Sequence, residues 1–279
     1  AYPEPHPAAK LAADHDVDVV SEIEIAMLAH PSARIVGITG TNGKSTTTAL
    51  IGHCLNVAGI PAAVGGNIGD TACQMDDPGP DGVIVLELSS YQLETTPSLR
   101  TDMSVVLNIS PDHLDRHGGM DGYVEAKARI LKALDGRGLA ILGDGDGHVR
   151  SLAVARAAEG LPVEIARDND APPSIAACPA LTGAHNAENA AAAALVLRQL
   201  GVSTTIIDQG MGSFAGLPHR LQHVASAGPI AFVNDSKATN GVAAARALQA
   251  FENIYWVAGG LAKDCLLYTS DAADDMASG

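Results

Sequence analysis

The sequence has 279 residues, of which 47% are hydrophobic, 18% are charged and 3% are aromatic, and its formal net charge is −15. The apolar content excludes a wholly disordered chain, and the acidic balance argues against binding along a nucleic acid backbone. No apolar run approaches the roughly 20 residues that a membrane-spanning helix needs. The 4 cysteines are widely separated and form no CxxC pair, which favours reduced thiols over a disulfide framework or a zinc site. The length predicts about two domains.

Strand patterns alternate with helical patterns in the part of the chain before Gly216. The predicted strands are Arg34–Thr39, Val83–Leu88, Met103–Ile109 and Leu139–Leu142. The predicted helices are Lys44–Ala58, Asp121–Leu134 and Asn186–Leu200. This alternation predicts an α/β fold with a doubly wound, mainly parallel sheet.

The pattern starts again after Gly216. A strand is predicted at Pro229–Val233, a helix at Gly241–Phe251 and a second strand at Ile254–Ala258. Together they predict one βαβ unit, the start of a Rossmann-like second domain. Because one such unit cannot bury both faces of its sheet, we expect this domain to be incomplete.

A glycine-rich turn between a predicted strand and a predicted helix carries the strongest functional signal. The segment Gly37–Leu50 reads GITGTNGKSTTTAL. Backbone N–H groups in such a turn face a phosphate, so we expect Lys44 to reach the β- and γ-phosphates of a nucleotide and Ser45 to bind Mg²⁺. The strict phosphate-loop pattern is not met, because Ile38 stands in the place of its first glycine.

The GTNGKS turn resembles the ATP-binding loop of the Mur ligases, the ATP-dependent amide-forming enzymes of peptidoglycan synthesis. The other segments that resemble the family, in its order, are GGNIG (Gly65–Gly69), LELSSYQLE (Leu86–Glu94), NISPDHLDRH (Asn108–His117), GAHNAEN (Gly183–Asn189), GLPHR (Gly216–Arg220) and NDSKATN (Asn234–Asn240). LELSSYQLE and NDSKATN favour the members that add D-glutamate to UDP-N-acetylmuramoyl-L-alanine. The resemblance implies an ATPase domain of the Mur-ligase type, with those two substrates, ATP and two Mg²⁺ ions.

The resemblance also implies a set of ATP-binding residues. They are Gly40, Thr41, Asn42, Gly43, Lys44, Ser45, Thr46, Asn186, Arg220 and Asp235. Asn186 stands where a helix begins, and helix capping is the structural alternative for it. Arg220 follows an expected hinge at Gly216–Pro218, so it would reach the γ-phosphate only when the two domains close.

Three further residues are implied as catalytic groups and metal ligands beside Lys44 and Ser45. Glu87 ends a buried strand, where a carboxylate needs a cation, and its alternative is a capping or salt-bridged role. His113 is placed in the first turn of a helix that Ser110 caps, and the resemblance makes it a ligand of a second Mg²⁺, although imidazole is an unusual partner for that ion.

Lys127 is the third of these groups. It lies on the apolar stripe of the predicted Asp121–Leu134 helix, which also carries Tyr123, Ile130, Leu131 and Leu134. One interpretation is a lysine that extends along an apolar surface to reach water. The other is a buried amine with a lowered pKa, which matches the family lysine that CO₂ converts to a carbamate. We predict carbamylation of Lys127.

The resemblance places the remaining residues at the substrates. Asn67 is expected near the transferred phosphate and Ser89 at the substrate carboxylate, although turn or helix capping would also explain both. Lys237 and Thr239 are expected to position D-glutamate. Lys263 corresponds more loosely to another lysine of the amino-acid site.

The expected domains are a remnant of an N-terminal UDP-binding domain at residues 1–32, a central ATP-binding domain at 33–215, a truncated C-terminal domain at 216–264 and a tail unlike the family at 265–279. We therefore expect this chain to be an inactive, monomeric, cytoplasmic fragment of a ligase that contacts neither nucleic acid nor membrane. Two alternatives remain open. One is another amide ligase of the same fold, such as a folylpolyglutamate synthase. The other is a nucleotide-binding module without ligase activity.

Overall fold

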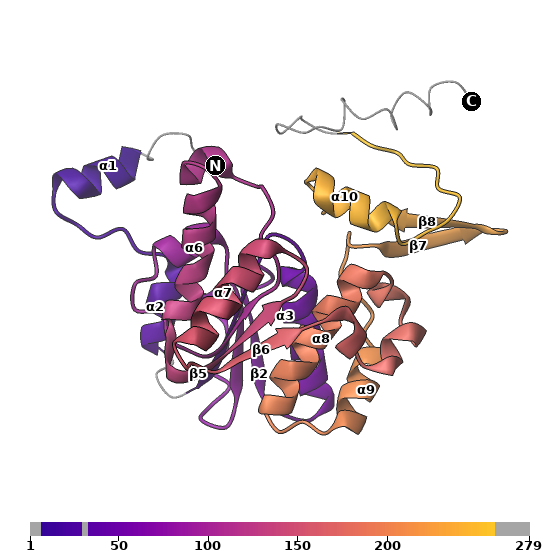
Figure 1. Ribbon diagram of the computed structural model, residues 1–279, viewed down its shortest axis with the longest axis horizontal. Coiled ribbons are helices and arrows are strands. Elements are labelled where there is room, and N and C mark those ends of the chain that lie inside the picture. The colour runs from indigo at the N-terminus through magenta and orange to yellow at the C-terminus, as the bar shows by residue number, and fades with distance from the viewer. Residues whose placement is uncertain (1–6, 30–32, 260–279) are drawn as a thin grey trace.

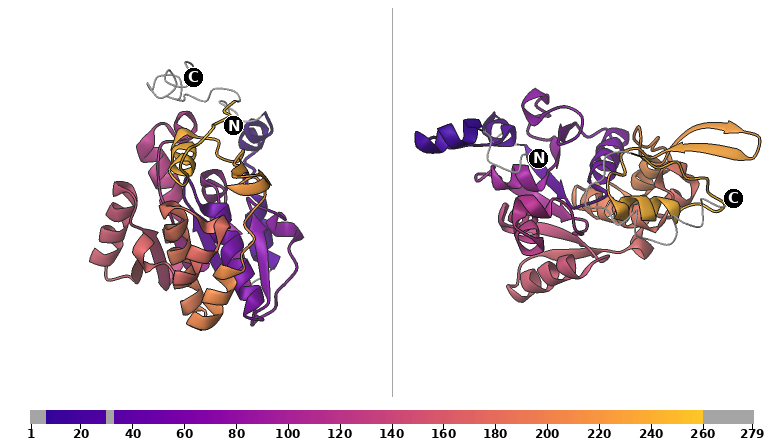
Figure 2. Two further views of the ribbon diagram at one scale, coloured as in Figure 1. Left: turned by 90° about the vertical axis from the view of Figure 1, so that its right-hand side faces the viewer. Right: turned by 90° about the horizontal axis from the view of Figure 1, so that it is seen from above.

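A central six-stranded parallel sheet organises the molecule. The computed structural model describes residues 7–29 and 33–259, shown in Figures 1 and 2. The strand order is β2-β3-β1-β4-β5-β6, and every neighbouring pair is parallel. The strands are β1 (Arg34–Thr39), β2 (Ala62–Gly66), β3 (Val83–Glu87), β4 (Thr101–Val106), β5 (Leu134–Gly143) and β6 (Val163–Ala166). The predicted doubly wound parallel sheet is confirmed.

Helices cover both faces of this sheet. The helices of this part of the chain are α1 (Pro7–Asp14), α2 (Glu22–Ala29), α3 (Lys44–Val57), α4 (Ser90–Glu94), α5 (Leu114–His117), α6 (Met120–Lys132), α7 (Gly147–Ala158), α8 (Ala184–Gln199) and α9 (Thr204–Gly212). The α1 helix buries no residue and does not cover the sheet. Short 3₁₀ helices lie at Ala72–Gln74, Asp168–Asp170, Pro173–Ala177 and Pro179–Leu181. The α3, α8 and α9 helices form one buried cluster with the sheet, and α2, α6 and α7 form the other.

The strand β1 could be predicted from the sequence because both faces of the sheet are covered at this strand. Val36 and Ile38 pack into the cluster with α3, whereas Ile35 packs into the cluster on the opposite face. Successive side chains of a strand point to opposite faces, so a strand that is covered on both sides is an unbroken apolar run. The predicted bounds of this strand and the predicted start of α3 agree with the structure.

The residues after Gly216 form a separate, smaller unit that differs from its prediction. The strands β7 (Gln222–Ala227) and β8 (Ile230–Asn234) pair as an antiparallel two-stranded sheet, and α10 (Gly241–Leu248) follows. The predicted strand at Ile254–Ala258 is wrong, because these residues form no strand and Tyr255 and Val257 are 94% and 96% exposed. A β-branched and aromatic run becomes a strand only where a neighbour pairs with it and covers it, and β8 pairs with β7 instead. Figure 1 shows this unit beside the main body, above α8.

Candidate functional site

The glycine-rich turn leaves β1 and enters α3 at the carboxyl edge of the sheet. Gly40 and Gly43 have φ values of 151° and 86°, and Gly43 is the N-cap of α3. Asn108, which follows β4, holds the turn: its backbone oxygen accepts from Thr41 N at 2.7 Å and its Oδ1 accepts from Asn42 N at 2.9 Å. In an α/β sheet this edge, where the chain order reverses, is the usual ligand crevice.

Lys44 folds back over the turn that precedes it. Its Nζ donates to the backbone oxygens of Gly40 and Thr41, each at 2.9 Å. Burial lowers the pKa of this lysine, the nearby Glu87 carboxylate raises it, and Arg220 lowers it further. A flexible ammonium so close to the α3 N-terminus is in reach of any phosphate bound there.

Glu87 ends β3 next to the turn. Its side chain is buried, and Oε1 accepts from Asn67 Nδ2 at 3.0 Å. The other oxygen, Oε2, is buried without a hydrogen-bond partner. An unpartnered carboxylate oxygen and a hydroxyl, here those of Glu87 and Ser45, are the oxygen donors that Mg²⁺ prefers, so the residue types fit a magnesium ion.

Lys127 comes from α6 to the same turn. It is 1% exposed, its Nζ donates to Gly40 O at 2.7 Å, and it lies 4.7 Å from the centre of the Tyr123 ring. Burial lowers its pKa well below the ordinary 10.5, and Lys44 lowers it further, against smaller opposing effects of Asp112 and Glu87. The side chain therefore does not extend to solvent, which decides against the first of the two sequence interpretations.

The structure corrects the expected position of His113. The helix α5 begins at Leu114, so neither Ser110 nor Pro111 opens it. His113 itself is the N-cap, with a left-handed φ of 53°, and its backbone oxygen accepts from Arg116 N at 3.1 Å. Asn108 and Ser110 instead bind the phosphate turn, which keeps them out of a helix. The ring of His113 packs edge-on against Tyr91 at 5.4 Å and is partly exposed.

A hollow of about 80 Å³ lies between the phosphate turn and the unit after Gly216. We call it the nucleotide pocket. Its lining contains the sequence-predicted residues Asn42, Gly43, Thr46, Asn186, Arg220, Asp235 and Lys237. It also contains His185, Asn189 and Arg246, which sequence reasoning did not list as site residues. Asn189 had a detectable signal, because it lies one helical turn after Asn186 and so shares its face of α8.

Arg220 links the two units across this pocket. Its Nη2 donates to Ser45 Oγ at 2.7 Å. The flanking residues His219 and Leu221 both have left-handed backbones, with φ values of 63° and 43°. Asp235 holds this segment, since its Oδ1 accepts from Leu221 N at 3.0 Å. Burial raises the pKa of Asp235, whereas the Leu221 hydrogen bond and Arg220 lower it.

The other sequence-predicted residues have more varied positions. Ser89 is the N-cap of α4 and forms a capping box with Gln92. Asn186 does not cap α8, because the N-cap is Gly183; its Nδ2 donates to Thr182 O at 2.9 Å. Thr239 is exposed and does not line the nucleotide pocket. Lys263 and the predicted tail lie outside the described residues.

Gly43 offers a direct test of the turn geometry. A methyl group at Gly43 would overlap Asn189 Oδ1, and the left-handed backbone adds roughly 1–2 kcal/mol of strain. We expect Gly43→Ala to weaken ADP binding by about tenfold or more, as measured by calorimetry. The matched control is Gly59→Ala, with a φ of 70° and open space around it. Equal ADP affinity of the two variants would contradict the assigned geometry.

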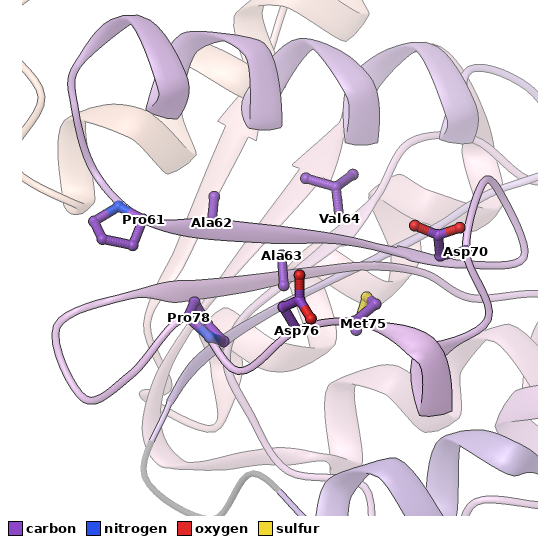
Figure 3. A pocket seen from close by; sticks show the side chains of 8 residues that line it. All are labelled: Pro61, Ala62, Ala63, Val64, Asp70, Met75, Asp76 and Pro78. Atoms are coloured by element: carbon purple, nitrogen blue, oxygen red, sulfur yellow. The ribbon is translucent and has the colours of Figure 1, made fainter.

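A larger hollow of about 400 Å³ lies along the edge strand β2 (Figure 3). In Figure 3, Ala62 and Val64 point to one side of β2, and Ala63 lies on the other side with Met75 and Asp76. None of the sequence-predicted site residues lines this hollow. It is therefore separate from the phosphate turn.

None of the helices within 7–29 and 33–259 has the length and apolar character of a membrane span. In the same ranges, no three His, Cys, Asp or Glu side chains gather closely enough to hold a metal ion.

Comparison with known proteins relates the chain to one family of enzymes. Residues 38–170 match the Mur ligase middle domain. The chain is 41% identical to the UDP-N-acetylmuramoylalanine–D-glutamate ligase of Paramagnetospirillum magneticum, with 94% of this chain and 62% of that protein covered. It is 43% identical to the enzyme of the same name from Rhodospirillum rubrum, with 94% and 60% covered. The chain thus spans about three fifths of the length of these relatives.

Solved structures share the fold at lower identity. The crystal structure of MurF from Acinetobacter baumannii superimposes with a TM-score of 0.61 at 22% identity, covering 81% of this chain and 56% of the other. A murein peptide ligase from Psychrobacter arcticus gives a TM-score of 0.58 at 19% identity, with 88% and 60% covered.

Proposed function

The part of this chain from residue 38 to residue 170 belongs to the Mur ligase family as its middle domain, and from this premise we propose that the complete protein uses ATP to join D-glutamate to UDP-N-acetylmuramoyl-L-alanine. The observation that carries the proposal is the convergence on one phosphate turn of Lys44, the half-partnered Glu87 carboxylate and the buried Lys127 amine. A nucleotide-binding module without ligase activity has no evident use for the buried Lys127 amine. We place the protein in the cytoplasm, where ATP and nucleotide-linked precursors are found, and treat it as a monomer.

ATP binding is supported by the turn and the pocket beside it. The N–H groups at the α3 N-terminus and Lys44 receive the phosphates. Arg220 approaches from the second unit and adds a positive charge at Ser45, so that closure of the two units completes the phosphate site. With a net charge of −15, the chain depends on these few local donors to hold an anion.

Magnesium ions are part of this proposal. Ser45 and Glu87 would hold one ion, while His113 and a carbamate on Lys127 would hold a second. When bound, such ions neutralise charge on the phosphates that react. The residues of the chain then have the tasks of positioning: Asn67 orients the Glu87 carboxylate through its 3.0 Å hydrogen bond, and Asn108 fixes the turn.

The reaction has two steps. A carboxylate oxygen of the L-alanyl group attacks the γ-phosphorus of ATP, the bond to the β-phosphate oxygen breaks, and an acyl phosphate and ADP result. The D-glutamate amine then attacks the acyl carbon, the carbon–oxygen bond breaks, phosphate leaves and the amine loses a proton. Lys237, Thr239 and Lys263 are the proposed positioning groups for D-glutamate, and Ser89 is proposed at the carboxylate. Catalysis by positioning and charge neutralisation requires no protein nucleophile.

Phosphate release tests the proposal directly. Released phosphate is measured with ATP, Mg²⁺ and UDP-N-acetylmuramoyl-L-alanine, with and without D-glutamate, for this chain and for the longest reading frame that contains it. We expect D-glutamate-dependent release from the longer protein. Release that depends instead on a folate and L-glutamate would show the folylpolyglutamate-type alternative to be correct.

A further inference from the structure

Arg246 lines the nucleotide pocket from α10, together with Ala243 and Ala247. Its guanidinium has no hydrogen-bond or ion-pair partner among the residues that the structure describes. An arginine that is unpaired in the protein and faces a pocket is available to a ligand.

The helix α10 is attached directly to the phosphate turn. Asn240 caps the helix by accepting from Ala243 N at 2.8 Å, and its Nδ2 donates to Asn42 Oδ1 at 3.2 Å. Positions three and four apart lie on one face of a helix, so Asn240, Ala243, Arg246 and Ala247 face the same side. The face that contacts the turn is therefore the face that carries Arg246.

The spacing places Arg246 away from the phosphates. Arg246 is six positions after Asn240, which corresponds to about 9 Å along a helix. A nucleotide whose phosphates lie at the turn extends by about that length to its sugar and base. Arg246 thus lies opposite the nucleoside half, while Lys44 and Arg220 serve the phosphate half.

The titratable neighbours of the Arg246 guanidinium lie at the start of α8. They are His185 and Glu188. Burial lowers the pKa of His185, and Arg246 lowers it further. Burial raises the pKa of Glu188, whereas a backbone hydrogen bond and Arg246 lower it. Arg246 and the α8 residues His185, Asn186 and Asn189 line the same pocket, so the guanidinium and the start of α8 share that space.

We propose that Arg246 binds the nucleoside half of the nucleotide, with its planar guanidinium stacked on the purine base. The small side chains of Ala243 and Ala247 leave room for a flat group beside it. Arginine stacks well because it is planar, permanently charged and weakly hydrated. This assignment rests on the proposed function, since it presupposes that the pocket binds ATP.

The test compares ADP with inorganic tripolyphosphate, which has phosphates but no nucleoside. Calorimetry in Mg²⁺ buffer is carried out on the full chain and on Arg246→Ala, Arg246→Lys and Arg198→Ala. The last variant removes an exposed arginine near the other end of α8 and controls for net charge. We expect Arg246→Ala to weaken ADP about tenfold and to leave tripolyphosphate unchanged. Arg246→Lys, which keeps the charge but not the plane, is expected to recover only part of the ADP affinity.

The outcomes separate this inference from the function on which it rests. If the unchanged chain binds neither ADP nor tripolyphosphate, the proposed nucleotide site is wrong and Arg246 has no ligand. If both bind but Arg246→Ala loses no ADP affinity, only the role of Arg246 is overturned. An equal loss for ADP and tripolyphosphate also overturns it, because the arginine would then act on the phosphates. Thermal unfolding of each variant verifies that it is folded.

Discussion

Lys127→Ala is expected to reduce ligation by the complete protein by about a thousandfold, with partial recovery in high formate. In the proposed modification the Lys127 ammonium first loses a proton, the neutral amine attacks the carbon of CO₂, a nitrogen–carbon bond forms as one carbon–oxygen π bond opens, and a second proton leaves, so a cation becomes an anion. Burial lowers the pKa of the ammonium, which makes the neutral amine available for this step. Formate offers a free carboxylate in place of the carbamate. Activity that neither formate nor bicarbonate restores at all would contradict the carbamate.

The modification itself has a readout that does not depend on activity. The chain equilibrated with ¹³C-bicarbonate is expected to show a carbamate resonance that is lost in Lys127→Ala. Lys132→Ala is the matched control, because Lys132 lies on the same helix but is exposed. A resonance that survives in Lys127→Ala would place the carbamate elsewhere.

The lowered pKa of Lys127 also predicts how stability depends on pH. Between the folded pKa and the ordinary 10.5, the unfolded chain binds more protons than the folded chain, so stability rises with pH through that window. Lys127→Met removes this dependence. We expect the methionine variant to be more stable at pH 7 by about 1 kcal/mol or more, and the gap to shrink toward pH 10. Urea unfolding measures this, and a gap that widens with pH would oppose it.

Lys44→Met is expected to weaken ADP and ATP binding by about a hundredfold. The ammonium now satisfies two carbonyl oxygens of its own turn and lies next to Glu87, so it can move to a phosphate without first leaving bulk water. Charge-assisted bonds to phosphate are among the stronger polar contacts in proteins, and methionine keeps the length of the side chain without the charge.

The control for this variant is Lys10→Met, which removes an exposed lysine of α1. Calorimetric titration with ADP compares the two, and urea unfolding verifies that both are folded. If Lys44→Met loses less than about threefold in affinity while Lys10→Met loses none, Lys44 does not contact the phosphates and the assignment of the turn fails.

The fold could be predicted where burial on both faces makes the pattern unambiguous. β1 and the start of α3 agree with the sequence prediction because an unbroken apolar run meets a glycine turn there. The position of Lys127 on an apolar helical stripe left two interpretations open, a lysine that reaches water and a buried amine, and the structure shows the buried amine. These are local signals, and the structure adds the partner, Gly40 O, that only the fold brings within reach.

The failures have tertiary causes. His113 was expected inside a helix, but Asn108 and Ser110 are used by the phosphate turn, and no local pattern reveals that use. The strand expected at Ile254–Ala258 had suitable residues but pairs with no strand in the part of the chain that the structure describes. Arg246 was not predicted as a site residue. Its proposed role depends on its distance along α10 from Asn240, and only the fold brings Asn240 into contact with Asn42.

The nucleotide pocket has two walls of different character. One wall is formed by the phosphate turn, the start of α3 and the start of α8, two helices that pack in the buried core on the six-stranded sheet, so we expect slow amide exchange there. The other wall is formed by Arg220, Leu221, residues 235–238 and α10, which buries none of its residues. The residues of the second wall are protected from amide hydrogen exchange only by a group that contacts both walls. A bound nucleotide would therefore slow amide exchange in the second wall and leave the exchange rates of the first wall unchanged.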